Sequence, residues 1–60
     1  MPGKFVIKKG SSGQFHFNLV STNGETVATS ETYTTKESCK EGIAAVKRLA
    51  PDAEIVDQSS

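Results

Sequence analysis

The sequence predicts a small α+β domain in which a three-stranded antiparallel meander is followed by one helix and a short C-terminal strand, in the order β-β-β-α-β. Three observations lead to this fold class. Two stretches alternate apolar and polar residues, as half-buried strands do; an Asn-Gly pair marks a hairpin; and apolar residues at helical spacing follow a capping sequence. We expect one domain over 1–60, with 58–60 as a frayed tail.

Two predicted strands occupy the first third of the chain. Phe5 and Ile7 alternate with Lys4, Val6 and Lys8, and Phe15, Phe17 and Leu19 alternate with a second, mainly polar set. Alternate residues of a strand point to opposite faces, so these five side chains are expected to face the core.

The loop between these strands is constrained by that shared face. All five side chains have odd numbers, so the numbers of two residues that lie opposite each other must sum to an even value. A simple loop of four residues would give an odd sum and is therefore excluded. We therefore expect a loop of three or five residues, or a bulge, with Gly10 or Gly13 at positive φ.

Asn23-Gly24 predicts a two-residue hairpin turn and a third strand over about Glu25 to Thr32. This register has four notable cross-strand pairs: Leu19 with Ala28, Val20 with Val27, Phe17 with Ser30, and His16 with Glu31. The second face of the sheet would then carry a set of candidate interaction residues: Val6, His16, Val20, Val27, Glu31 and Tyr33. We expect this face to serve either binding or self-association.

The remaining elements are a helix and a short strand. Thr34 to Glu37 predicts a capping box that starts the helix, and Pro51 predicts its end near Ala50. The helix carries an apolar stripe: Cys39, Gly42, Ile43, Val46, Leu49 and Ala50. A glycine inside a helix disfavours it, so Gly42 predicts a close approach of helix to sheet. The segment 54–57, with Ile55 and Val56, predicts the fourth strand.

Composition leaves self-association as the most natural source of extra stability. A chain of 60 residues buries only about 60% of its unfolded surface. Cys39 is the sole cysteine, so no internal disulfide is expected, and the free thiol favours the cytoplasm. One Cys and one His predict no metal site, and no cofactor is expected. Apolar runs of membrane-spanning or signal-peptide length are absent.

Charge gives no strong indication of a polyanionic partner. Seven basic and seven acidic side chains cancel, although the two halves differ. Residues 1–30 hold three bases and one acid, or +2, while 31–60 hold four bases and six acids, or −2. Nucleic acid and membrane are thus disfavoured as partners.

The sequence resembles the YegP-like family of short bacterial domains, which has no established biochemical function. The resemblance covers nearly the whole chain and rests on five features: Phe15-x-Phe17-x-Leu19, Asn23-Gly24, Ser30-Glu31, Tyr33, and Gly42-Ile43 with Val46. It implies a β-β-β-α-β unit found as tandem repeats or as a single copy that dimerises with exchanged C-terminal strands. No catalytic residues are implied.

Three sets of residues are candidate sites. His16 opposite Glu31 could form an acid/base pair of a small hydrolase, although such a pair is more often a structural contact. Cys39 could be a nucleophile, but its place on the apolar stripe favours burial. Lys4, Lys8 and Lys9 could bind nucleic acid weakly, or simply protect an exposed edge.

We therefore expect a non-enzymatic interaction module that forms a homodimer by exchange around Ile55 and Val56, with an unidentified protein as a further possible partner. A weak nucleic-acid-binding protein is the alternative, and a small hydrolase is the third reading. Salt dependence separates the first two, because contacts to phosphates weaken steeply with salt.

Overall fold

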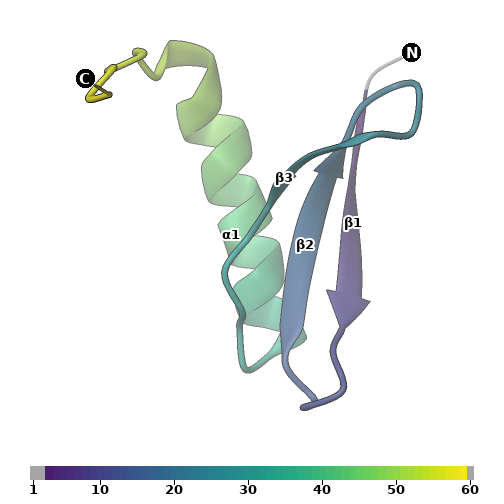
Figure 1. Ribbon diagram of the computed structural model, residues 1–60. Helices are drawn as coiled ribbons and strands as arrows, with labels where there is room; N and C mark the ends of the chain where they lie inside the picture. The colour runs from purple at the N-terminus through teal and green to yellow at the C-terminus, as the bar shows by residue number, and fades with distance from the viewer. Residues whose placement is uncertain (1–2, 60) are drawn as a thin grey trace.

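A computed structural model describes residues 3–59. It contains β1 (Lys4–Lys9), β2 (Phe15–Val20), β3 (Thr26–Thr29), α1 (Lys36–Leu49) and a single 3₁₀ turn, η1 (Ala50–Asp52). The strands form one antiparallel sheet in the order β1-β2-β3, and α1 runs along one face of it (Figure 1). The predicted three-stranded antiparallel sheet followed by one helix is confirmed.

The first hairpin has the predicted parity. Three pairs share the helix-facing side of the sheet: Phe5 with Leu19, Ile7 with Phe17, and Lys9 with Phe15. Beyond the strands, the Gly10 amide donates to the Gln14 carbonyl at 2.8 Å, which leaves a three-residue loop over 11–13. Within it the Gly13 amide donates to the Gly10 carbonyl at 3.0 Å. Gly13 has a φ of +86°, which glycine adopts without steric cost. The prediction for this loop is confirmed.

The second hairpin differs from the predicted two-residue turn. The Ser21 amide donates to the Glu25 carbonyl at 2.8 Å, and the Gly24 amide donates to the Ser21 carbonyl at 3.0 Å, which defines a three-residue loop. Gly24 has a φ of +89°, whereas none of the non-glycine residues in 3–59 has positive φ. The predicted two-residue turn needs positive φ at Asn23 as well, which this hairpin lacks. The wider three-residue loop forms instead, with Gly24 in the left-handed conformation. The Ser21 hydroxyl supports this loop through a bond to the Asn23 carboxamide oxygen.

The extra loop residue shifts the register of β3, and a bulge shifts it back. Val20 lies opposite Thr26 rather than Val27, whereas Leu19 lies opposite Ala28 as predicted. Val27 is the additional residue in this bulge, which restores the alternation so that Ala28 faces the helix. Regular pairing in β3 ends at Thr29, short of the predicted Thr32.

Beyond β3 the chain stays beside β2 through individual hydrogen bonds. The Ser30 amide donates to the Phe17 carbonyl at 2.9 Å, as the predicted pairing of these residues requires. A second irregularity follows, because Tyr33 forms an isolated bridge with Phe15. Two residues, 31 and 32, thus lie across from one residue of β2.

The helix begins one residue later than predicted. Thr35, not Thr34, is the N-cap, and its hydroxyl oxygen accepts a 3.1 Å hydrogen bond from the Ser38 amide. Glu37 falls in the first turn, where a carboxylate suits the helix dipole, but it does not complete a capping box. The local sequence offers two adjacent threonines, and the backbone reaches extended geometry at the second.

This cap makes a simple prediction. Thr35→Ala should lower the free energy of unfolding by about 1 kcal/mol, because an amide of the first turn loses its acceptor. Thr34→Ala is the matched control and should change it by less than about 0.5 kcal/mol. Urea denaturation followed by circular dichroism measures both. Equal losses in the two variants would contradict the assignment.

Close packing of α1 on the sheet occurs at its N-terminal half. Cys39 is fully buried, as predicted, and Phe17 beneath the helix is 6% exposed. A Cβ atom at Gly42 would overlap the ring and hydroxyl of Tyr33, so only glycine permits this approach. The predicted role of Gly42 is confirmed. Leu49 at the other end of the stripe is 61% exposed, so the helix leaves the sheet partly uncovered there.

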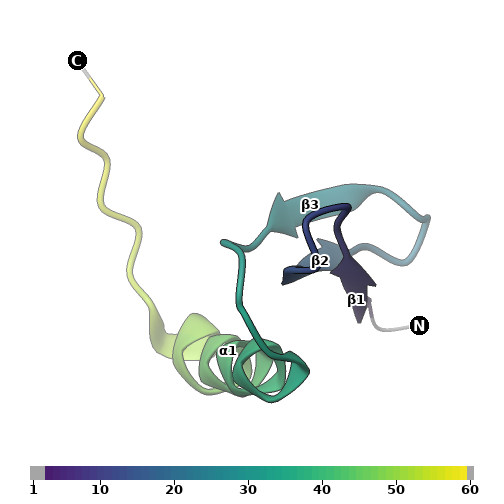
Figure 2. The ribbon, with the colours of Figure 1, turned by 90° about the horizontal axis from the view of Figure 1, so that it is seen from below.

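The C-terminal segment does not form the predicted fourth strand within this chain. The helix ends at Leu49 and η1 follows with Pro51 in its first turn, so the predicted end near Ala50 is confirmed. From Ala53 to Ser59 the chain carries no regular secondary structure and projects away from the body (Figures 1 and 2). It leaves on the side of α1 away from β1, so neither sheet edge is beside it. Ser60, the end of the predicted frayed tail, lies outside the described residues.

Candidate interaction site

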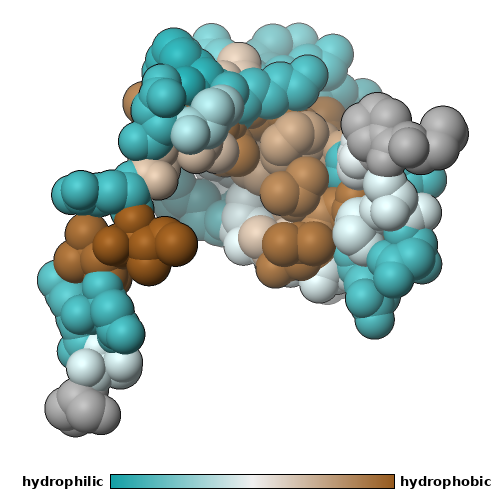
Figure 3. All heavy atoms as spheres, turned by 90° about the horizontal axis from the view of Figure 1, so that it is seen from above, coloured by the Kyte–Doolittle hydropathy of each residue, from teal (hydrophilic) through white to brown (hydrophobic). Residues whose placement is uncertain are grey.

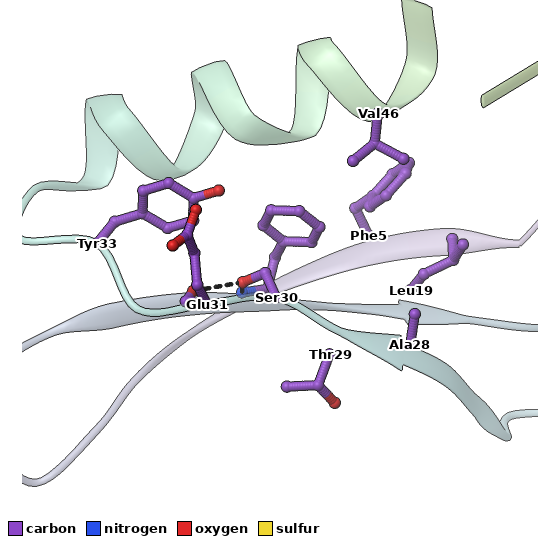
Figure 4. A pocket seen from close by; sticks show the side chains of 9 residues that line it. Phe5, Leu19, Ala28, Thr29, Ser30, Glu31, Tyr33 and Val46 are labelled. Atoms are coloured by element: carbon purple, nitrogen blue, oxygen red, sulfur yellow. Dashed lines mark hydrogen bonds between the residues drawn. The ribbon is translucent and has the colours of Figure 1, made fainter. Parts of the chain in front are cut away.

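An open groove of about 360 Å³ lies between the sheet and the C-terminal half of α1 (Figure 4). Nine residues line it: Phe5, Phe17, Leu19, Ala28, Thr29, Ser30, Glu31, Tyr33 and Val46. The sheet forms the floor, and Val46 points down from the helix toward Phe5 (Figure 4). The lining is mainly apolar, so the groove suits aliphatic side chains.

Aromatic contacts hold the floor of the groove in place. The rings of Phe5 and Phe17 meet edge to face, with centroids 5.7 Å apart and an interplanar angle of 73°. Phe17 and Tyr33 are stacked at 6.3 Å and 14°. Both geometries are favourable for aromatic pairs, so this part of the groove is preformed.

Polar groups lie at one end of the groove. The Phe17 amide donates to the Ser30 hydroxyl at 2.9 Å, and that hydroxyl donates to the Glu31 carbonyl at 2.7 Å (Figure 4). The Glu31 carboxylate points to the helix side, next to Tyr33 (Figure 4). These groups give the groove one polar, acidic end.

The projecting tail carries the most exposed apolar side chains of the described residues. Ile55 is 97% exposed and Val56 is 65% exposed. Figure 3 shows hydrophobic atoms in two separate places, on this tail and in the hollow beside the helix. The Ser59 hydroxyl and amide hydrogen-bond to Asp57 and lower the pKa of its carboxyl. The tail is therefore apolar at its centre and anionic around it.

The candidate interaction residues do not share one face. Val6, His16 and Val20 lie on the face away from the helix, because they alternate with helix-facing neighbours in β1 and β2. Tyr33 and Glu31 were predicted on that face but lie on the groove side (Figure 4). The irregular register after Ser30 accounts for this correction.

Two further residues complete the face away from the helix. Val27 is 65% exposed in the bulge of β3. Asn18 lies between Val6 and Thr29 and is 8% exposed, and its carboxamide oxygen has no hydrogen-bond partner in the described part of the chain. Asn18 was not predicted to be a functional residue, although a polar residue between apolar ones in a central strand is a visible signal.

The predicted His16–Glu31 pair is not formed. Residues 31 and 32 lie across from His16, but the Glu31 carboxylate is on the helix side of the sheet and His16 is on the other side. Within residues 3–59 no three Cys, His or carboxylate side chains come together as a metal site.

The three lysines of β1 are also divided. Lys9 is 5.6 Å from the ring centre of Phe15 on the helix side, whereas Lys4 and Lys8 point the other way. None of the helices formed by residues 3–59 has the length and apolar character needed to cross a bilayer.

These features define a class: a small α+β domain with one helix on a three-stranded sheet, an apolar groove left open, and an apolar tail left free. A family model described as "Domain of unknown function (DUF1508)" matches residues 11–57. The chain belongs to this family, which confirms the resemblance to YegP.

Individual relatives support the assignment. A UPF0339 protein of Treponema denticola is 46% identical over 57 residues, which are 95% of this chain and 98% of that protein. The UPF0339 protein YegP of Escherichia coli is 48% identical over 54 residues, which are 90% of this chain but 49% of YegP. The chain thus spans about half the length of YegP. An NMR solution structure of a protein from Haloferax volcanii matches with a TM-score of 0.85 and 33% identity over 93% of this chain and 95% of that one.

Proposed function

We propose that the chain is a non-enzymatic interaction module that works as a homodimer, in which each C-terminal tail packs against the groove side of the other copy. One observation carries this proposal: an apolar tail with Ile55 97% exposed and an open apolar groove occur on the same small molecule. Exposed apolar groups of this kind mark interaction sites, and exchange of an identical element is a low-cost route to a dimer.

The small core gives the exchange a thermodynamic reason. Phe17 and Cys39 are the only apolar residues of 3–59 that are buried. Covering the side chains of Ile55 and Val56 should contribute about 1.5 to 3 kcal/mol for each one fully buried. That gain is large against the roughly 3 to 5 kcal/mol that a core of this size supplies.

The lengths of the relatives support the same idea. YegP of Escherichia coli is about twice as long as the part that matches this chain. A second unit in such a chain could take the place that a second copy takes here. The apolar lining of the groove, and the position of His16 on the opposite face, support binding rather than catalysis.

The test is a measurement of mass and stability against concentration. Light scattering at micromolar concentration should give twice the monomer mass, and the melting temperature should rise with protein concentration. The double variant Ile55→Asp with Val56→Asp should be monomeric and melt lower. The control, Gln58→Asp with Ser59→Asp, adds the same charge to the same tail and should stay dimeric. A monomeric wild type with a concentration-independent melt would rule the dimer out.

A further inference from the structure

The loop between β2 and β3 presents Asn23 and Gly24 to solvent. Both residues are exposed, and the loop extends beyond the sheet on the side away from α1 (Figure 2). A Cβ atom placed on Gly24 would meet no other atom within 4 Å, so this part of the loop is open to its surroundings. Asparagine is one of the chemically labile residues of proteins, and here nothing shields it.

The side chain of Asn23 is held by Ser21. The Ser21 hydroxyl donates a hydrogen bond to the carboxamide oxygen of Asn23 and accepts a 3.3 Å bond from the Glu25 amide. A donor on a carbonyl oxygen stabilises the negative charge that forms there when a nucleophile attacks the carbonyl carbon. The backbone nitrogen of Gly24, the next residue along the chain, is the nucleophile that can reach this carbon and close a five-membered ring.

We propose that Asn23 is a site of spontaneous covalent modification in the folded protein, and that the Ser21 hydroxyl promotes the reaction. The Gly24 nitrogen loses its proton to solvent and bonds to Cγ of Asn23, and the carboxamide nitrogen takes up a proton and leaves as ammonia. The product is a succinimide ring, which one water molecule opens at either carbonyl to give aspartate or isoaspartate. One water is consumed and one ammonia is released, with no oxidant or cofactor.

Glycine at position 24 favours ring closure, and one hydrogen bond opposes it. Without a Cβ atom, Gly24 places no side chain beside the forming ring, and its backbone has wide conformational freedom. Its amide donates to the Ser21 carbonyl at 3.0 Å, and this bond must break before the nitrogen attacks. Because the bond lies in an exposed loop, water can replace the lost partner, so breaking it costs little free energy.

Asn18, the other asparagine of the chain, provides an internal comparison. It is 8% exposed in β2, and the residue that follows it is Leu19, whose side chain crowds the attacking nitrogen. β2 pairs with a strand on each side, so its backbone cannot rotate to close a ring. The fold therefore restricts the reaction to Asn23.

The two products should affect the hairpin differently. Aspartate leaves the main chain unchanged, and its carboxylate still accepts a hydrogen bond from the Ser21 hydroxyl. Isoaspartate adds one carbon to the main chain of a three-residue loop, whose ends are joined by the 2.8 Å bond from the Ser21 amide to the Glu25 carbonyl. We expect this bond to weaken in the isoaspartate product, which should therefore melt at a lower temperature than the aspartate product.

Mass spectrometry of the incubated protein tests the proposal. Folded wild type kept at pH 8 and 37 °C should show replacement of NH₂ by OH, and peptide mapping should place the change at Asn23 and not at Asn18. Ser21→Ala should react at least threefold more slowly, because the donor to the carbonyl oxygen is lost. Ser21→Thr keeps the hydroxyl and should react at close to the wild-type rate. In concentrated urea all three proteins should react equally fast, because the hydrogen bond is absent there.

Contrary results would separate the site from the role of Ser21. An unchanged Asn23 in the folded protein, over a time in which the urea-unfolded protein is converted, would overturn the site. Faster reaction of folded Ser21→Ala than of wild type would show that Ser21 protects Asn23 and would overturn its promoting role. If circular dichroism shows Ser21→Ala unfolded, Ser21→Cys under reducing conditions replaces it and should also react more slowly, since a thiol is a weaker donor. The reaction uses no residue of the groove or tail, so its outcome is independent of the proposed dimer.

Discussion

Replacing Phe17 by alanine is expected to leave most of the protein unfolded at 25 °C. Phe17 is 6% exposed, contacts Phe5 and Tyr33 on either side, and lies beneath Gly42 of the helix. Removing a buried phenylalanine costs about 3 to 5 kcal/mol, because contacts are lost and a cavity remains. That is comparable to the whole stability expected of a core of this size.

Urea denaturation of Phe17→Ala, followed by circular dichroism, measures this loss. Phe15→Ala is the matched control: it removes the same side chain from the same face of β2, at a half-buried position. It should lose clearly less stability. A cooperative melt of Phe17→Ala near the wild-type temperature would show that the core lies elsewhere.

Gly42→Ala is expected to destabilise the protein by about 1 to 3 kcal/mol, the range typical of overpacking. Intrinsic helix propensity alone predicts the opposite sign, a gain of about 1 kcal/mol. We expect the steric overlap to outweigh helix propensity, because a Cβ atom at position 42 would collide with Tyr33 and come within 3.3 Å of Phe17. The backbone of Tyr33 bonds to Phe15 in both directions, at 2.7 and 2.8 Å, and its ring is stacked on Phe17, so making room requires the ring to leave that contact.

A double-mutant cycle gives the test of this prediction its specificity. Tyr33→Leu removes the phenol ring that the new methyl group would meet. In that background Gly42→Ala should cost less than in the wild type, so the two changes should not be additive. Glu41→Ala, at the exposed neighbouring position, should change stability by less than about 0.5 kcal/mol. Net stabilisation by Gly42→Ala alone would show that the helix is not held this close to the sheet.

The parts of the fold that depend on parity and periodicity could be predicted from sequence. Because Phe5 and Phe17 share a face, the loop between their strands must have an odd number of residues, and the structure has such a loop. The second hairpin shows the limit of this approach. Asn23-Gly24 suits two kinds of turn, and the hydrogen bonds around Ser21 select the wider one. The bulge at Val27 then depends on that selection, which local sequence does not determine.

The groove could not be predicted, because it depends on how elements distant in the sequence are placed. Tyr33 lies on the helix side only because the register after Ser30 is irregular. The β-branched residues of 54–57 led to the wrong prediction of a fourth strand, because a strand needs an edge to pair with as well as suitable side chains. The described chain places no edge within their reach.

Because Cys39 is buried, the reactivity of its thiol can report how often the domain opens. It is the only thiol of the chain, and none of its surface is accessible while α1 lies on the sheet. A thiol reagent can therefore react only during moments when the helix lifts or the domain opens. The rate of labelling would measure how often this happens, without any added probe. Comparison of dilute and concentrated samples would show whether association with a second copy slows that opening.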